Sequence, residues 1–223
     1  MTRSLVEARN LGRRFGGGEA AVEALEGATF TIEAGDRIAL VGPSGSGKST
    51  LLNLVAGLDD PTSGDIAWPG LGGRDQLRPL AIGMIHQFSS LVPTLSVTEN
   101  VALPLRLGHC PNNAGAVAEA IAAMGLAAFA DRLPGELSGG QAQRVAMARS
   151  LAHRPKLLIG DEPSGQLDRD TAQSVLGTLL EYVSSTGAAM LIATHDQTVA
   201  DRMRSIWTIQ HGRLQIRASG IAA

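Results

Sequence analysis

The sequence predicts an α/β fold in which a buried mixed sheet carries a phosphate-binding loop. Three features predict it. Residues 42–50 read GPSGSGKST and fit the pattern G-x-x-x-x-G-K-[ST]. An apolar stretch, 37–41, leads into this loop, and a helix-forming stretch, 50–56, leads out of it. Two further apolar stretches, 156–162 and 188–196, end in polar or acidic side chains, as parallel strands do at the edge where ligands bind.

The composition limits the class of protein. The chain has 223 residues, enough for one large α/β domain with a sizeable core. A formal charge of -2 gives no general reason to expect a nucleic acid partner. The single cysteine, Cys110, cannot form an internal disulfide. Because we find neither a signal-peptide core nor ~20 consecutive apolar residues, we expect a soluble, cytoplasmic chain that reaches a membrane only through another protein.

Short β-type runs open the chain. Residues 5–8 and 28–32 are such runs, and a glycine triplet at 16–18 lies between them. This pattern predicts an antiparallel sheet before the phosphate loop. Phe15 precedes the glycines in a chain with few aromatic residues. It is either packed in the core or available as a platform on which a nucleotide base stacks.

The loop at 42–50 contains the residue types that a bound phosphate requires. Its glycines let the backbone turn N–H groups inward. Lys48 supplies a positive charge for the outer phosphates, and the hydroxyl of Ser49 is placed to reach a magnesium ion. The helix that begins near this point directs its positive end at the same anion. We expect the whole loop to bind a nucleotide, through Gly42, Pro43, Ser44, Gly45, Ser46, Gly47, Lys48, Ser49 and Thr50.

The middle of the chain changes from strand to helix. Residues 65–68 and 81–86 are expected strands, with a glycine-rich, charged loop at 70–79 between them. Gln87 ends the second strand, where a carboxamide either caps the strand or meets a metal-bound water. Residues 98–154 are rich in alanine and predict a helical subdomain inserted into the sheet. The core and antiparallel sheet of this single domain, 1–223, then comprise residues 1–97 and 155–223.

Two acidic residues end the strand expected at 156–162. Asp161 suits a metal held through its water shell, and Glu162 is either the general base that activates water or a surface acid at a strand end. An amphipathic helix at 170–186 buries its apolar face. The strand after it delivers His195, which either contacts the γ-phosphate or is an ordinary loop histidine. Two short strands close the domain, at 206–210 and 213–216.

A serine and two glycines open a second helix at 137–141, which reads LSGGQ. Such a helix N-terminus accepts an anion. One nucleotide does not need two of them, so the second is explained if it serves the nucleotide of another copy of the chain. An ordinary N-cap accounts for Ser138 but gives no reason for Gly139, Gly140 and Gln141.

Taken in order, these motifs resemble the nucleotide-binding subunit of an ABC transporter, over nearly the whole chain. Six family motifs have counterparts: Walker A at 42–50, the Q-loop at Gln87, the signature at 137–141, Walker B with the catalytic glutamate at 157–162, the D-loop at 164–168 and the switch histidine at His195. Phe15 matches the aromatic residue that stacks on adenine. The stretches 57–64 and 91–101 are similar to the branch that serves MacB-type and lipoprotein-releasing (LolD-type) permeases.

The resemblance implies a P-loop ATPase of ABC type that hydrolyses ATP with Mg²⁺. Its catalytic residues would be Glu162, His195 and Lys48, and the metal would be surrounded by Ser49, Gln87 and Asp161. Residues outside the phosphate loop would also contact the nucleotides, namely Phe15, Ser138, Gly139, Gly140, Gln141 and Asp168.

The resemblance also implies two partners. Two copies would form a head-to-tail dimer with two ATP molecules between them, so that Ser138 and Gly140 contact the γ-phosphate bound by the other copy. A membrane permease would dock near residues 88–105 and hold the chain on the inner face of the cell membrane. No nucleic acid is expected.

The motifs leave the role of the ATPase open. The chain powers an exporter or a lipoprotein-releasing transporter, or it regulates a membrane partner that moves no substrate. A small-molecule kinase uses the same kind of phosphate loop, but the signature motif and Glu162 beside Asp161 argue against a kinase.

Overall fold

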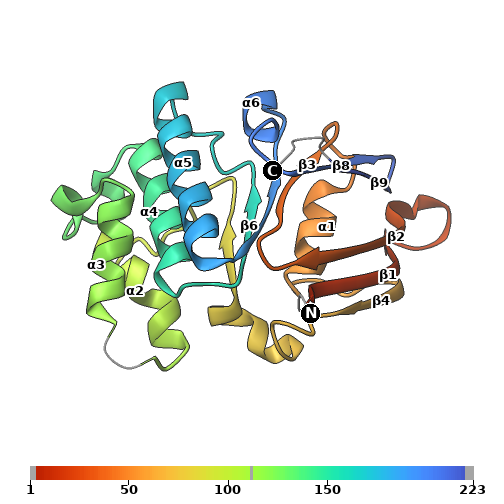
Figure 1. Cartoon of the computed structure of the whole chain (residues 1–223), viewed down its shortest axis with the longest axis horizontal. Coiled ribbons are helices and arrows are strands. Elements are labelled where there is room, and N and C mark those ends of the chain that lie inside the picture. Colours follow the sequence, from red (N-terminus) through yellow and green to blue (C-terminus); the bar gives the residue numbers. More distant parts are fainter. Residues whose placement is uncertain (1–3, 111–112, 219–223) are drawn as a thin grey trace.

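The computed structural model describes residues 4–110 and 113–218. The ends of the expected domain, 1–3 and 219–223, lie outside the described residues, as do residues 111–112. Figure 1 shows the described helices α2 to α5 gathered at one end of the molecule and a small sheet at the other, with a larger sheet between them. The α/β fold expected from the sequence is therefore confirmed.

The small sheet has three strands in the order β2-β1-β4. Its strands are β1 (Ser4–Phe15), β2 (Val22–Glu33) and β4 (Ser63–Ala67). All pairings are antiparallel, and Ala8 is paired with Phe30 and with Ile66. The antiparallel sheet expected before the phosphate loop is confirmed, although β1 and β2 are longer than the runs at 5–8 and 28–32 because their bulged ends continue to pair.

The larger sheet has six strands in the order β5-β6-β7-β3-β8-β9. Their bounds are β3 (Arg37–Val41), β5 (Ile82–Ile85), β6 (Leu157–Asp161), β7 (Ala189–Ala193), β8 (Ser205–Gln210) and β9 (Arg213–Ala218). The pairings are parallel except that β9 runs antiparallel to β8, so the sheet is mixed. Asp161 is paired with Ala193, which brings the ends of β6 and β7 to one edge. The phosphate loop leaves the same edge from β3.

Helix α1 (Lys48–Val55) follows the phosphate loop and packs between the two sheets. Its inner side chains, such as Leu51 and Leu54, are fully buried with residues of both sheets. The ring of Trp68, just after β4, donates its N–H to the carbonyl of Val55 at 2.8 Å. Phe30 of β2 and Trp207 of β8 place their ring centroids 4.9 Å apart. Aromatic contacts thus join the small sheet to the large one.

Within residues 4–110 and 113–218, three α-helices lie between β5 and β6 along the chain: α2 (Val97–Leu107), α3 (Ala114–Ala123) and α4 (Gly139–Ala152). They share an apolar core with α5 (Arg169–Thr186), as the side chains of Val101, Val145 and Leu179 illustrate. The short helix α6 (Gln197–Ala200) follows β7. A helical region is present where alanine-rich sequence predicted it, and its limits as a subdomain at 98 and 154 stay a prediction.

The segment expected as a loop at 70–79 differs from the prediction. It contains a 3₁₀ turn at Arg74–Gln76 and a π-type turn at Leu77–Ala81. The reason is local: Leu77 is fully buried, and the side chain of Gln76 accepts a hydrogen bond from the N–H of Gly73. Glycine content alone does not reveal such contacts.

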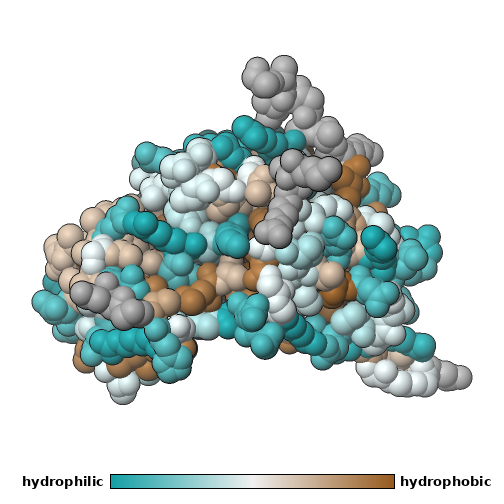
Figure 2. Space-filling view, turned by 60° about the horizontal axis from the view of Figure 1, so that its bottom comes forward, coloured by the Kyte–Doolittle hydropathy of each residue, from teal (hydrophilic) through white to brown (hydrophobic). Residues whose placement is uncertain are grey.

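The surface is mixed in polarity. In the view of Figure 2, hydrophilic and intermediate side chains cover most of the face, and hydrophobic side chains show as patches among them. Among residues 4–110 and 113–218, no helix is both long enough and apolar enough to cross a membrane.

Candidate functional site

The phosphate loop connects β3 to α1 with a backbone that glycine makes possible. Gly47 is the N-cap of α1 and has φ 109°, and Gly45 has φ 73°. Both values lie in the left-handed region that side chains disfavour. A Cβ on Gly47 would also collide with the carbonyl oxygen of Ala24 in β2. The loop is therefore built into the fold with its curve already formed.

A cavity of about 540 Å³ lies over the loop. Besides loop residues and the start of β2, it is lined by four side chains that the sequence analysis singled out: Gln87, Asp161, Glu162 and His195. These come from the ends of β5, β6 and β7, which are neighbours in the sheet. The structure thus brings the expected phosphate, metal and water-activating groups to one place, at the edge where open α/β sheets bind ligands.

Lys48 lies across the loop and is 9% exposed. Its Nζ donates to the carbonyl oxygens of Gly42 at 2.8 Å and Pro43 at 3.0 Å. These acceptors hold the ammonium group inside the curve of the loop. Because a phosphate oxygen carries negative charge, it makes a stronger partner for this group than a neutral carbonyl does.

Ser49 and Asp161 form the oxygen-rich part of the cavity. The hydroxyl of Ser49 donates to Oδ2 of Asp161 at 2.6 Å, which links the first turn of α1 to the end of β6. Together with the side-chain oxygen of Gln87, these are the hard ligands that Mg²⁺ prefers. Across the described ranges, 4–110 and 113–218, no three His, Cys, Asp or Glu residues gather into a metal cage.

The Glu162 carboxylate is held from two sides. Its Oε1 lies 3.2 Å from Nδ1 of His195, and its Oε2 accepts from Nε2 of Gln87 at 3.5 Å. Glu162 has φ 46°, an uncommon conformation for a residue with a Cβ. Its N–H donates to the carbonyl of Ala193 at 3.0 Å, which secures this turn. The left-handed turn is what lets Glu162 and the adjacent Asp161 both face the cavity.

Three residues that were expected to contact the nucleotide do not line the cavity. Phe15 is 43% exposed and does not line the cavity; the guanidinium of Arg13 lies 4.7 Å from its ring centroid. Ser46 belongs to the loop but is buried, and its Oγ finds no hydrogen-bond partner among the described residues. Asp168 is the N-cap of α5, where hydrogen bonds from Thr171 lower the pKa of its carboxyl group. Their roles with nucleotide stay predictions.

The LSGGQ segment also lies outside this cavity. Ser138 caps α4: its Oγ accepts from the N–H of Gln141 at 3.2 Å, and its N–H donates to Oε1 of Gln141 at 2.8 Å. This capping box gives Gln141 a structural role that the sequence analysis missed. It leaves the glycines unexplained, because a Cβ on Gly139 would meet none of the described atoms within 4 Å and one on Gly140 would make only ordinary contacts.

Gln143 is among the buried polar residues that the sequence did not single out. Gln143 of α4 is 1% exposed and donates to the carbonyls of His86 and Pro163, the neighbours of Gln87 and Glu162. A signal was available: Gln143 and Ser150 are seven residues apart, so they share one face of α4 with the buried apolar residues Ala146 and Met147. Sequence alone does not say whether such a polar position faces solvent.

Fold and site together define a class. A phosphate loop between a strand and a helix, with Asp161 and Glu162 at the end of a parallel strand of the same sheet, is the arrangement of a P-loop NTPase.

The comparisons with known proteins narrow the class to a family. The family model described as "ABC transporter" matches residues 25–165. The chain therefore belongs to the ABC transporter family.

Relatives in this family match along most of their length. The lipoprotein-releasing system ATP-binding protein LolD 1 of Rhodospirillum rubrum is 42% identical over 91% of this chain and 93% of its own. LolD of Legionella pneumophila is 40% identical over 96% of this chain and 98% of its own. An uncharacterised ABC transporter ATP-binding protein of Mycobacterium tuberculosis is 39% identical over 94% of this chain and 88% of its own.

A solved structure shows the same fold. The ATP-binding cassette MJ0796, in a dimeric structure of a post-hydrolysis state with ADP and Pi, superposes with a TM-score of 0.88. It is 32% identical and the match covers 96% of this chain and 98% of that one.

Proposed function

We propose that this chain is the ATP-hydrolysing subunit of a membrane ABC transporter. The observation that carries the proposal is the convergence of Gln87, Asp161, Glu162 and His195 on the phosphate-loop cavity. This convergence supplies a phosphate cradle, oxygen ligands and a carboxylate able to accept a proton from water, which are the parts that ATP hydrolysis needs.

In this proposal each side chain has one task. Lys48 binds the outer phosphates, and Glu162 is the general base that takes a proton from the attacking water. His195 orients that carboxylate and contacts the γ-phosphate. Ser49, Gln87 and Asp161 hold Mg²⁺, which neutralises charge on the phosphate oxygens when it is bound. Glu162 is already held by two side chains, so its orientation costs little when substrate arrives.

The working unit would be a head-to-tail dimer. Ser138, Gly139 and Gly140 lie outside the cavity of their own chain, and the fold gives no steric reason for the glycines. Close approach of a γ-phosphate bound by a second copy supplies that reason. The cassette MJ0796 is dimeric in its solved structure, which supports the assembly of two copies.

The membrane partner would be a permease that docks near residues 88–105 and keeps the chain on the cytoplasmic face. Phe88 is 69% exposed beside Gln87, and an apolar side chain so placed suits a protein contact. The two LolD relatives make a lipoprotein-releasing transporter the first candidate for the complex. A regulatory ATPase that gates a membrane protein without transport is the second candidate, since it would use the same catalytic groups.

One experiment separates these functions. The chain is tagged, purified with its membrane partner in detergent and placed in liposomes, and phosphate release is measured with ATP and Mg²⁺. A transporter ATPase releases free phosphate, and its rate rises when the transported substrate is added. Phosphate release that no candidate substrate changes, while ATP still alters the partner's conformation, supports the regulatory role. Transfer of phosphate to a small molecule with no free phosphate overturns both.

A further inference from the structure

Gln143 is a buried carboxamide that connects α4 to the segments behind the cavity. It is 1% exposed. It shares a helix face with Ser150, about two turns later, whose hydroxyl donates to the carbonyl of Met84 in β5 at 2.6 Å. This face of α4 therefore hydrogen-bonds the backbone beneath it. At such burial, water does not readily replace a partner that is lost.

The two partners of Gln143 stand next to the two residues that meet over the cavity. Its Nε2 donates to the carbonyl of His86 at 2.9 Å and to that of Pro163 at 3.1 Å. His86 precedes Gln87, and Pro163 follows Glu162. One nitrogen atom thus fixes the separation of the two backbone segments. The side chains of Gln87 and Glu162 are 3.5 Å apart, at the outer limit of a hydrogen bond, so a small shift of either segment separates them.

The contacts also fix which way the amide faces. Carbonyl oxygens only accept, so the NH₂ group of Gln143 must face them and Oε1 must face away. Oε1 is buried and finds no hydrogen-bond partner among the described residues. A buried acceptor left without a partner lowers stability. A contribution to folding alone does not account for that cost, whereas a role in holding two catalytic segments does.

We propose that Gln143 is a positioning residue for ATP hydrolysis, which sets Glu162 at the correct distance from Gln87 through their backbone neighbours. The inference rests on the proposed function. It also gives α4 a mechanical task, because the helix begins at Ser138. When a second copy binds at the Ser138 end of α4, Gln143 transmits any movement of the helix to the segments that carry Glu162 and Gln87.

The first test replaces the carboxamide with a side chain of the same length. Gln143→Met keeps the packing and removes both donors. Because a misplacement of about 1 Å costs about 10²-fold in rate, kcat should fall between about 10- and 100-fold. The Kd for ATP should stay close to wild type, because the phosphate loop is untouched, whereas the thermal midpoint should fall somewhat because the carbonyls of His86 and Pro163 lose their donor. Ser150→Ala is the matched control: it removes another bond from α4 to β5 but leaves the Glu162 segment alone, so kcat should stay within about twofold.

The second test asks whether Gln143 acts through Gln87. In a Gln87→Ala background, Gln143→Met should lower kcat by much less than it does in the wild type, because residues of one unit have non-additive effects. An equal fold-change in both backgrounds would mean that Gln143 acts independently, and an unchanged kcat in the single variant would mean that it does not act at all. Either result overturns the inference.

Two further outcomes, an inactive wild type and a variant that does not fold, are distinguishable from a failure of this inference. If the wild type itself releases no phosphate, the proposed function fails rather than this inference. If Gln143→Met does not fold, Gln143→Asn replaces it, since asparagine keeps the amide but withdraws it by one methylene. The same loss of kcat with unchanged ATP binding then supports the positioning role, and wild-type kcat contradicts it.

Discussion

Nδ1 of His195 lies 3.2 Å from Oε1 of Glu162, although the two residues belong to different strand ends. The sheet places them together because β6 and β7 are paired neighbours, with Asp161 opposite Ala193. The side chain of Glu162 is 23% exposed and that of His195 is 73% exposed, so the carboxylate is the sheltered member. The histidine approaches from the open side, which suits a group that changes partners when nucleotide enters.

Glu162→Gln should abolish turnover while leaving ATP binding intact. The amide keeps the shape of the carboxylate but cannot accept the proton of the attacking water, and general-base catalysis is worth about 10²–10⁴-fold. Uncleaved ATP should then trap the dimer, which light scattering would detect. Glu181→Gln, on the outer side of α5, is the matched control and should behave as wild type. Undiminished hydrolysis by Glu162→Gln would remove Glu162 from its role.

His195→Ala should lower kcat through Glu162. If the two residues act as a unit, the double variant His195→Ala with Glu162→Gln should be no slower than Glu162→Gln alone. Single-turnover phosphate release measures all three variants. If the fold-losses of the two single variants multiply in the double variant, the 3.2 Å contact has no part in catalysis.

Ser138→Arg should block hydrolysis without weakening nucleotide binding to the monomer. Ser138 is exposed and lies outside its own cavity, so an added guanidinium should leave nucleotide binding to the monomer intact and obstruct a site formed with a second copy. The substitution also removes the Oγ that caps α4, so a loss of thermal stability is expected beside the loss of hydrolysis. Fluorescent-nucleotide binding at low protein concentration and phosphate release at high concentration separate the two effects. Ser185→Arg, near the exposed end of α5, serves as the control. Equal loss of binding and hydrolysis would mean that Ser138 acts within its own chain.

Much of this fold could be predicted from the sequence because its key elements are strongly marked. The strand at Arg37–Val41 and the loop after it are specified by an apolar run followed by glycines and Lys48. The acids at the end of β6 were placed correctly for the same reason: an apolar run that ends in charge leaves few alternatives.

Other features depend on long-range contacts that periodicity does not encode. Nothing in the local sequence shows that Glu162 adopts φ 46° or that Gln143 is buried, because both follow from the strands and loops packed around them. The turns at 74–81 were missed since the buried Leu77, not glycine content, decides their shape. The capping role of Gln141 could have been found, because Ser-x-x-Gln is a known helix-start pattern.

Phe88→Ser should weaken association with the permease but not basal ATP hydrolysis. The ring is 69% exposed, so its removal costs little folding stability. The backbone just after it is held by Arg149 of α4, which donates to the carbonyls of Ser89 at 3.3 Å and Ser90 at 3.1 Å, so the ring is presented from a fixed segment. Co-purification of the membrane partner measures the effect.

Leu58→Ser is the control for Phe88→Ser. Leu58 is also an exposed large apolar residue, 44% exposed, but it lies in the turn after α1 and outside the segment 88–105 that is expected to dock. An equal loss of membrane partner in both variants, or no loss in either, would remove residues 88–105 from the predicted docking surface.

Asn100→Ala should destabilise the start of α2. Asn100 is fully buried, and its amide nitrogen donates to the carbonyls of Val92, Leu95 and Ser96 while its Oδ1 accepts from the N–H of Val92. Truncation removes the acceptor of the Val92 N–H and the donor to the Leu95 carbonyl, whereas the carbonyls of Val92 and Ser96 keep backbone donors, and the expected cost is about 2–4 kcal/mol. Urea unfolding measures it. A midpoint equal to that of wild type would show that water or backbone movement replaces the amide.

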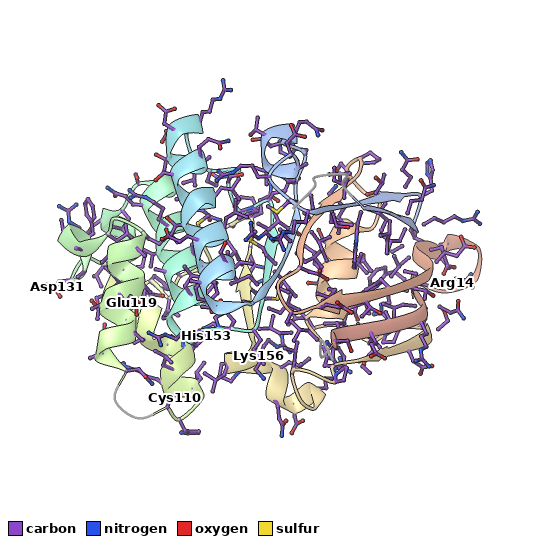
Figure 3. All side chains as sticks on the ribbon, viewed as in Figure 1. Arg14, Cys110, Glu119, Asp131, His153 and Lys156 are labelled. Atoms are coloured by element: carbon purple, nitrogen blue, oxygen red, sulfur yellow. The ribbon has the colours of Figure 1, made fainter. Side chains whose placement is uncertain are left out.

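His153 should make stability depend on pH below neutrality. It lies at the C-terminal end of α4 (Figure 3), with Nδ1 3.3 Å from the carbonyl oxygen of Arg149. Burial lowers the pKa of this imidazole, so the folded chain binds a proton less readily than the unfolded chain, where histidine titrates near a pKa of about 6.5. Its contribution to stability is therefore complete above about pH 6.5 and falls as the pH drops toward the folded pKa, by at most about 1.4 kcal/mol per pH unit.

His153→Asn removes the titration, so wild-type urea midpoints should fall more steeply than those of the variant between pH 7.5 and 5.5. Parallel curves for wild type and His153→Asn would contradict the prediction.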